Sequence, residues 1–295
     1  MVDENGREAL SVMVITHDEE DNIARCLDSV SWADDIVVVD SGSDDRTVEI
    51  VRGYTDRVFE REFTDFSDQR EFAASKCRND WVLSIDADEV VSEELRREIE
   101  VAVSDGLCDA YYLPDATHIF GGWLKHGSGN PDYHIRLYRR SKGKWQGVVH
   151  ERVVTVGTIG FLDSPILHYS YQDVSSFVAG VNRYTTLEAE LTETRPGHLV
   201  RSLCLRPVKA FVDSFFLEGG YLGGARGLIV SVLRATHEFL RWAKLWVKFA
   251  PRGVEAGSPY SRVNVRTRLI RWLMRKGLIF RNPGAPPGGE TKGTA

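Results

Sequence analysis

The chain has 295 residues, of which 42% are hydrophobic and 27% charged, and this is ordinary for a folded soluble protein with one large domain or two small ones. Its four cysteines form no C-x-x-C pair, so neither a disulfide framework nor a zinc site is indicated, and a reducing compartment is favoured. The polar start MVDENGREAL lacks the pattern of a secretory signal, and no run of 18 apolar residues is free of charge. We therefore expect a cytoplasmic protein without a membrane span.

The net charge of −6 is divided unevenly along the chain. Residues 1–194 contain 19 Lys and Arg against 38 Asp and Glu, a balance of −19. Residues 195–282 contain 17 Lys and Arg against four acids, a balance of +13. An acidic body followed by a basic region indicates two different functions.

Strand-like and helix-like segments alternate over the first 105 residues. Four segments predict buried strands: 10–16, 36–40, 57–61 and 81–85. Four others predict helices: 21–30, 47–54, 69–78 and 92–103. Ser92 is a good N-cap for the last helix. Such alternation is typical of a parallel α/β sheet with right-handed crossovers.

The sequence changes in character after about residue 105. Residues 106–194 are rich in aromatic residues and glycine, and they predict strands and loops followed by a helix over 173–193. The segment 195–282 is basic and strongly apolar, and the Pro- and Gly-rich tail 283–295 is expected to be disordered. We therefore predict an α/β domain over 1–194, a basic helical region over 195–282 and a tail.

Polar and acidic residues follow three of the predicted strands, as THDEE at 16–20, DSGSDD at 40–45 and DADE at 86–89. In an open parallel sheet, ligands bind beyond the carboxyl ends of the strands. Neither G-x-G-x-x-G nor a P-loop motif is present, so dinucleotide and P-loop sites are not supported. Asp-x-Asp offers hard oxygen ligands that suit Mg²⁺ or Mn²⁺, although such a motif standing alone is more often a solvated turn.

Several longer motifs occur in order: SVMVIT-x-x-E, VVVDSGSDDRT, DFSDQREFA and WVLSIDADE, then GGWLKHG, PDYHIRLYRR, VVHERV, LHYSY and NRYTTLEAE. Together they resemble the family 2 glycosyltransferases, and in spacing the bacterial lipopolysaccharide-core β-1,4-glucosyltransferases. The resemblance covers about residues 10–250. It implies a GT-A fold, Rossmann-like with a mostly parallel sheet, whose nucleotide half spans about 10–105 and whose acceptor half spans about 106–194.

The resemblance also implies a site for a nucleotide-sugar donor, most simply a UDP-sugar. The residues that would bind this donor are Thr16, Glu19, Asp40, Ser41, Gln69, Arg70, Asp86 and Asp88. Two positions depart from the family pattern. Glu71 stands where the family usually has Asn, and Asp18 replaces a commoner Asn.

A divalent metal, Mn²⁺ or Mg²⁺, is implied in the same way. The ligands would be Asp88 and Asp86, with His150 and His168 available to complete the shell. Either histidine could instead simply hydrogen-bond within the core.

The resembled enzymes invert the anomeric carbon, which requires a base that accepts the proton of the acceptor hydroxyl. Glu151 of VVHERV is the favoured candidate, and Asp132 of NPDYH is the second. Glu151 could alternatively form a strand-edge ion pair with Arg152 or Arg136. Asp132 could instead orient the acceptor or cap a turn.

The segment 222–249 predicts the longest helix of the chain. Five basic side chains fall on one face of it: Arg234, His237, Arg241, Lys244 and Lys248. With apolar residues and tryptophans on the rest, this pattern favours a helix in the plane of an anionic membrane surface. A second helix is expected to begin at Pro207, with a glycine-rich bend at 219–224 between the two. Alternatively, these helices pack on each other or on a second subunit.

Two functions therefore remain open. One is a metal-dependent inverting glycosyltransferase that extends a lipid-linked saccharide, such as lipopolysaccharide core or a polyprenyl-linked glycan, at the cytoplasmic face of the plasma membrane. The other is a non-catalytic GT-A-like scaffold that docks a partner or a membrane through its basic helices. Nucleic acid is an unsuitable partner because the body is acidic and the basic region is too apolar.

Overall fold

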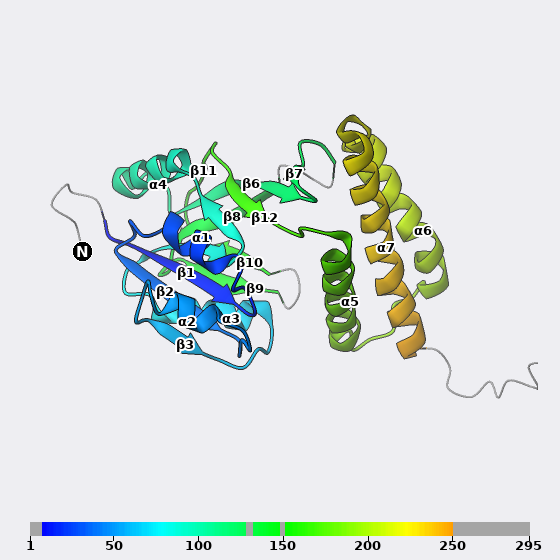
Figure 1. Ribbon diagram of the computed structural model, residues 1–295, viewed down its shortest axis with the longest axis horizontal. Helices are drawn as coiled ribbons and strands as arrows, with labels where there is room; N and C mark the ends of the chain where they lie inside the picture. Colours follow the sequence, from blue (N-terminus) through cyan, green and yellow to red (C-terminus); the bar gives the residue numbers. More distant parts are fainter. Residues whose placement is uncertain (1–7, 128–131, 148–150, 250–295) are drawn as a thin grey trace, which may run out of the picture. The chain divides into compact units, whose positions relative to one another are not determined.

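The computed structural model describes residues 8–127, 132–147 and 151–249, and within them a mixed sheet of ten strands organises the fold (Figure 1). The strands of this sheet are β1 (Leu10–Thr16), β2 (Asp35–Asp40), β3 (Val58–Glu60), β4 (Trp81–Asp86), β5 (Glu89–Val91), β6 (Ala110–Ile119), β7 (Gly122–Trp123), β8 (Asp132–Arg139), β11 (Ile159–Phe161) and β12 (Ile166–Tyr169). A separate two-stranded sheet pairs β9 (Gly143–Gln146) with β10 (Arg152–Thr155).

The main path of the large sheet runs β3-β2-β1-β4-β8-β6-β12-β5. The first four strands are parallel, as the alternating pattern predicts. Beyond β4 the sheet is mixed, because β8 runs antiparallel to both β4 and β6. The expectation of a mostly parallel sheet therefore holds for the nucleotide half and is wrong for the acceptor half.

The helices that cover the nucleotide half are α1 (Ile23–Ser29), α2 (Thr47–Val51), α3 (Phe66–Lys76) and α4 (Glu93–Asp105). Caps decide where two of them begin. The Ser92 hydroxyl accepts a hydrogen bond from the amide of Leu95, as predicted, and Asp65 accepts from the amide of Asp68. The Asp65 cap explains why α3 begins three residues before the predicted start.

Two apolar clusters lie on the two sides of the central strands. Val12, Leu83 and Ile85 belong to one, with side chains of α1 and α4, and Met13 and Val82 belong to the other, with side chains of α3. All five are buried, because side chains point alternately to the two faces of a strand and both faces are covered. This burial explains why strands β1 and β4 read as continuous apolar runs.

Three longer helices follow the sheet: α5 (Val174–Leu191), α6 (Leu199–Val212) and α7 (Gly224–Phe249). α7 packs against both α5 and α6 (Figure 1). The predicted boundary at residue 194 falls between α5 and α6. Among the helices of the described residues, none has the length and apolarity needed to cross a membrane.

A short π-helical turn, η1 (Asp213–Leu217), and a 3₁₀ turn, η2 (Gly220–Gly223), connect α6 to α7. The predicted glycine bend is confirmed here, since Gly219 and Gly224 have φ of 76° and 59°, a region that favours glycine. A Cβ on Gly227 would lie 1.9 Å from the carbonyl oxygen of Gly220, so this close approach also requires glycine. The expectation that Pro207 opens a helix is wrong. It lies inside α6, which already begins at Leu199.

Candidate active site

Three polar strand ends meet at one edge of the sheet. Thr16 is paired with Asp40 across β1 and β2, and Ile15 is paired with Asp86 across β1 and β4. Because the three strands are parallel, their carboxyl ends share this edge. The structure thus brings together the Thr16, Asp40 and Asp86 positions that the sequence assigned to one site.

The loop after β2 is organised by Asp40 itself. One carboxylate oxygen accepts hydrogen bonds from the amides of Gly42 and Ser43, both at 2.9 Å, and the other accepts from the Ser43 hydroxyl at 2.5 Å. Ser41 donates its amide to the carbonyl of Thr16 at 3.0 Å. The backbone bond therefore holds the end of β2 beside the end of β1, and the side-chain bonds of Asp40 fix the loop that follows.

Two buried oxygens at this edge have no hydrogen-bond partner among the described residues. They are Oγ1 of Thr16 and Oε1 of Gln69. The amide of Gln69 donates to the hydroxyl of Ser41 at 3.0 Å, which fixes the side chain beside the loop. Buried polar atoms normally have partners, so these two acceptors are available to a donor group of a ligand.

Arg70 links the strand end of β4 to the acceptor half. Its guanidinium lies 2.7 Å from Oδ1 of Asp86, 3.1 Å from the Ser84 hydroxyl and 3.3 Å from Oε1 of Glu151. It also lies over the ring of Trp145. Arg70 is almost fully buried, so these contacts hold α3, β4 and Glu151 in one arrangement. Glu151 thus pairs with Arg70, not with the Arg152 or Arg136 considered from the sequence.

Arg136 is a second buried cation, and the sequence considered it only as an ion-pair partner. It lies 2.8 Å from Glu89, 3.5 Å from Asp86 and 3.9 Å from Asp115. Although burial opposes ionisation of Asp86, Arg70 and Arg136 lower its pKa to about 2. The available signal was an arginine between two apolar residues of a strand, since such a charge is buried only with partners.

Glu89 stabilises the turn between Asp86 and Asp88. It accepts the amide of Asp86 at 2.7 Å and the guanidinium of Arg136 at 2.8 Å. Burial raises the pKa of Glu89 to about 7, with Arg136 acting in the opposite direction. Glu89 therefore shapes the Asp86–Asp88 turn and does not face a ligand.

Asp88 and His168 meet although 80 residues separate them in sequence. Pairing of β12 with β5 sets His168 opposite Glu89, and the amide of Tyr169 donates to the carbonyl of Asp88 at 2.9 Å. Nε2 of His168 lies 3.0 Å from Oδ2 of Asp88. Burial disfavours the charged imidazole, but Asp88, with Glu89 and Asp86 behind it, raises the pKa of His168 to about 10.

An excess of carboxyl groups remains around this pair. The groups that act on one another here are the acids Glu19, Asp86, Asp88, Glu89, Asp115 and Glu151 and the cations Arg70, Arg136, Arg183 and His168. Burial raises the pKa of Glu19 to about 7, and Asp88 and Asp86 raise it further, whereas a hydrogen bond from Asn22 lowers it. A cation bound among these acids would relieve their repulsion.

The donor atoms of Asp88 and His168 fit a divalent metal. Their 3.0 Å separation is close to that of neighbouring ligands that each lie about 2.1 Å from the same ion. Within the described residues, no cluster of three or more His, Cys, Asp or Glu side chains is arranged to hold a metal. Mg²⁺ is often bound by one or two protein groups together with substrate phosphates, and two ligands suit that mode. Of the other predicted ligands, Asp86 is paired with Arg70 and Arg136. His150 lies outside the described residues.

Asp132, the second candidate base, lies at the start of β8 with an exposed side chain. His134 is 3.4 Å from Asp132 and 3.7 Å from Asp115. His134 thus bridges the side chain of Asp132 to Asp115, which is also the cross-strand partner of Asp132. Glu151 is part of the cluster through its direct contact with Arg70.

The two departures from the family pattern have structural roles. Glu71 accepts the backbone amide of Trp145, which ties α3 to β9. Asp18 has φ of 54° and accepts the amide of Asp44 at 2.9 Å, so it links the loops after β1 and β2. Asp and Asn share the ability to adopt this left-handed conformation.

Comparison with known proteins identifies related sequences. Residues 11–152 match the family model described as Glycosyl transferase family 2. An uncharacterized glycosyltransferase of Rickettsia typhi is 32% identical over 251 residues, which cover 80% of this chain and 86% of the relative. The lipopolysaccharide core biosynthesis glycosyltransferase LpsC of Rhizobium meliloti is 28% identical over 253 residues, which cover 82% of this chain and 93% of LpsC. Among solved structures, S. aureus TarS 1-349 superposes with a TM-score of 0.42 at 15% identity, covering 94% of this chain and 98% of that one.

Proposed function

The chain belongs to glycosyltransferase family 2, and we propose that it is an inverting, metal-dependent enzyme that transfers a hexose from a UDP-sugar to a lipid-linked saccharide. The observation that carries this is the contact of Asp88 with His168 beside the Arg70 bridge from Asp86 to Glu151. These contacts support assigning the donor, metal and base roles to neighbouring residues at the carboxyl edge of the sheet. A non-catalytic scaffold would not need this constellation.

The donor nucleoside is assigned to the loops after β1 and β2. Thr16 and Gln69 each offer a buried oxygen without a partner among the described residues, and these can accept from a base N–H or a ribose hydroxyl. The sequence assigned the carboxylate oxygens of Asp40 to the donor, but in the structure both oxygens accept hydrogen bonds from the loop after β2. We therefore assign Asp40 and Ser41 to positioning the nucleoside site, with Glu19 at its rim.

Asp88 and His168 are assigned to the divalent metal. A bound Mn²⁺ or Mg²⁺ would stabilise the negative charge that grows on the departing diphosphate. His168 would bind the metal through a deprotonated ring nitrogen and Asp88 through its carboxylate, because ligands bind in their deprotonated forms. Arg70 and Arg136 keep Asp86 ionised and fixed behind the pair.

Glu151 is assigned as the base. The acceptor oxygen forms a bond to the anomeric carbon, the bond from that carbon to the diphosphate breaks, and the hydroxyl proton passes to the Glu151 carboxylate. Arg70 fixes this carboxylate at 3.3 Å. Asp132, exposed at the edge of the cluster, is assigned to orienting the acceptor.

A lipid-linked acceptor is supported by the relative LpsC, whose name places it in lipopolysaccharide core biosynthesis. Enzymes that extend such acceptors from a nucleotide sugar work at the surface where the lipid is embedded. We therefore propose that the protein is peripherally attached to the cytoplasmic face of the membrane.

A donor screen tests the proposal. UDP-, GDP- and dTDP-sugars are compared by thermal shift with Mn²⁺, and release of nucleoside diphosphate from the best donor is then measured. Glu151→Gln should lower kcat by about 10²–10⁴-fold while donor binding persists. Asp132→Asn is the comparison variant, with a smaller effect expected mainly on acceptor KM. Full activity of Glu151→Gln would remove the assignment of the base.

A further inference from the structure

The basic side of α7 contacts the chain itself. The ammonium group of Lys244 lies 2.6 Å from the carbonyl oxygen of Asn182 and 2.8 Å from the hydroxyl of Thr185. Lys248 donates to three carbonyl oxygens at the end of α5, those of Ala189, Glu190 and Thr192, and Arg241 lies 2.7 Å from Glu188. These cations satisfy the free carbonyls and the negative end of α5. Three of the five basic residues predicted to meet lipid headgroups, Arg241, Lys244 and Lys248, are therefore paired within the fold.

Apolar side chains instead occupy solvent-exposed positions of α6, η1 and α7. We call this set the helical apolar face: Leu205, Val208, Val212, Phe216 and Leu217 from α6 and η1, with Leu228, Val232, Phe239 and Trp246 from α7. On each helix the residues recur at intervals that keep them on one side, such as 205, 208 and 212. Val208 is 60% exposed and Leu217 76%.

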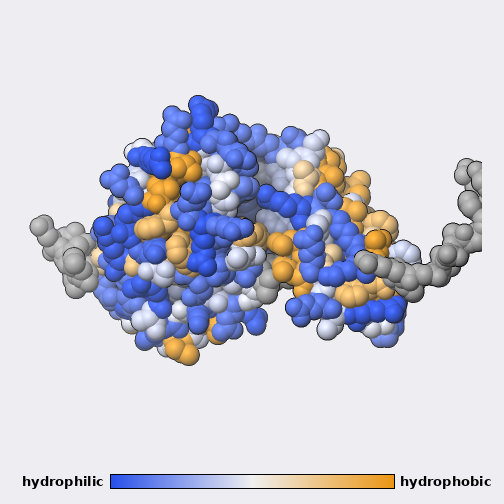
Figure 2. Space-filling model, turned by 90° about the horizontal axis from the view of Figure 1, so that it is seen from below, coloured by the Kyte–Doolittle hydropathy of each residue, from blue (hydrophilic) through white to orange (hydrophobic). Residues whose placement is uncertain are grey.

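Figure 2 shows hydrophobic residues over the helical part of the molecule, and smaller hydrophobic groups also appear on the part that carries the sheet. Apolar residues that recur at exposed positions along one side of a helix point to an interaction site, whereas single exposed apolar residues are common. Exposed apolar residues such as Val101, Leu107 and Val156 also occur on the part of the chain that forms the sheet.

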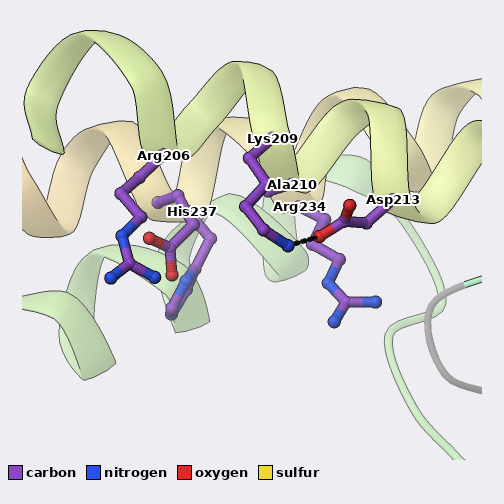
Figure 3. A pocket seen from close by; sticks show the side chains of 7 residues that line it. Arg206, Lys209, Ala210, Asp213, Arg234 and His237 are labelled. Carbon is purple, nitrogen blue, oxygen red and sulfur yellow. Dashed lines mark hydrogen bonds and ion pairs between the residues drawn. The ribbon is translucent and has the colours of Figure 1, made fainter.

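Cations of α6 accompany this face. Arg201, Arg206 and Lys209 are exposed. Arg206 and Lys209 also line a pocket of about 350 Å³ between α6 and α7, together with Arg234, His237, Ala210, Asp213 and Glu238. Figure 3 shows the side chains of Arg206, Lys209 and Arg234 extending to the same side of the two helices. Basic groups beside an exposed apolar stripe match the headgroup and acyl layers of an anionic bilayer.

We propose that the helical apolar face docks on an anionic lipid bilayer, with lipid phosphate groups in the Arg206–Lys209 pocket. This deepens the proposed function, because a lipid-linked acceptor is presented at such a surface. A second copy of the chain is a poorer occupant. A two-fold interface would set this face against itself and bring Arg201, Arg206 and Lys209 of both copies together.

Co-sedimentation of the full chain with vesicles tests the docking. Wild type should bind phosphatidylcholine vesicles that contain 30% phosphatidylglycerol, and bind pure phosphatidylcholine vesicles at least about tenfold more weakly. The triple variant Val208→Ser, Phe216→Ser, Leu217→Ser should lose at least about tenfold in affinity for the anionic vesicles. Its matched control is Val101→Ser, Leu107→Ser, Val156→Ser, which removes equally exposed apolar groups from the sheet domain and should bind as wild type.

The charge contribution is tested separately. Arg206→Gln with Lys209→Gln should weaken binding to anionic vesicles by about 30-fold, whereas the exposed pair Arg46→Gln with Arg97→Gln on the sheet domain should have no effect. Lipid phosphate and free phosphate are distinguished by adding inorganic phosphate at constant ionic strength, which should not displace the protein from vesicles.

Three results would overturn the docking proposal: no binding by wild type, wild-type binding by the triple serine variant, or a dimer in solution that this variant dissociates. If the triple variant fails to fold by circular dichroism, the single change Leu217→Asp at a 76% exposed position decides by the same criterion. Nucleotide release measured without vesicles should stay within about twofold of wild type in every variant. A variant that loses vesicle binding but keeps nucleotide release therefore tests the docking proposal alone. If the wild-type protein shows neither donor turnover nor Mn²⁺ dependence, the proposed function is wrong.

Discussion

The carboxylate cluster at the strand ends and the basic side of α7 are both dense in charge, yet they are neutralised differently. The cations of α7 find carbonyls, hydroxyls and carboxylates on neighbouring segments, so that Lys244 and Lys248 contribute to helix packing. At the strand ends, Arg70 and Arg136 neutralise Asp86 and Glu89, but acids remain in excess around Asp88. A buried cluster of like charges indicates a ligand site where its own fold leaves charge uncompensated.

The largest effect is expected from removing the buried cation that joins both halves of the site. Arg70→Met leaves Glu151 without its buried cation and Asp86 with Arg136 alone, and should lower the free energy of unfolding by about 3–5 kcal/mol. Guanidinium denaturation measures this. Arg46→Met, at a 73% exposed ion pair, is the control and should change stability by less than about 0.5 kcal/mol. Equal losses of stability in the two variants would show that the buried cation at the strand ends is no more important for folding than an exposed ion pair.

Loss of the proposed metal ligand should act more strongly on activity than on folding, although it also removes the ion pair with His168. Asp88→Asn should reduce kcat/KM for nucleotide release by at least about 100-fold and raise the Mn²⁺ concentration needed for half-maximal rate. The exposed Asp44 of the neighbouring loop supplies the control, and Asp44→Asn should keep near wild-type activity. An Asp88→Asn enzyme with unchanged Mn²⁺ dependence would remove Asp88 from the metal site.

On the helical side, Lys244 is expected to matter for stability and not for catalysis. Lys244→Met leaves the carbonyl of Asn182 and the hydroxyls of Thr185 and Thr186 without this donor, and should cost about 1–3 kcal/mol in urea denaturation. Lys209→Met, whose side chain is 65% exposed beside Asp213, should cost less than about 0.5 kcal/mol. A neutral Lys244→Met variant would show that the α7 cations are not packing elements.

The smallest effect concerns pH. The folded-state pKa of His168 is raised to about 10 from an ordinary value near 6.5, so its contribution to stability is complete below pH 6.5 and is lost as pH rises through 10. Glu19 and Glu89, whose folded-state pKa values are raised to about 7, also contribute to stability when protonated. Their contributions are lost at lower pH, between about pH 4.5 and pH 7.

In buffer with EDTA, the free energy of unfolding should therefore fall by on the order of 1 kcal/mol between pH 8 and pH 9.5. This figure is smaller than a fully buried group would give, because the His168 side chain is 31% exposed and water screens its charge. Urea denaturation at both pH values measures the difference. The same interval in His168→Gln should show a smaller change, and an identical slope in both proteins would contradict the Asp88–His168 ion pair.

Local sequence was sufficient for the nucleotide half of the fold. Strands β1, β2, β3 and β4 occur within a few residues of the predicted segments, because burial on both faces leaves a continuous apolar run. Their parallel order then sets Thr16, Asp40 and Asp86 at one edge, and the Ser92 cap follows from its own hydroxyl. These features depend on contacts near in sequence or on the general geometry of parallel sheets.

Only the tertiary structure decided which charges meet. Arg70 and Glu151 are 81 residues apart, and Asp88 and His168 are 80 apart, so no local pattern assigns the first pair or sets the second at 3.0 Å. On α7, the periodicity identified a basic side and an apolar side but not their orientation. Either side of α7 could pack against another part of the chain. The basic side could bind the carbonyls of α5, and the apolar side could pack on an apolar neighbour. The packing of α5 on α7 settled that choice, because cations placed against helix carbonyls gain partners that apolar side chains cannot use.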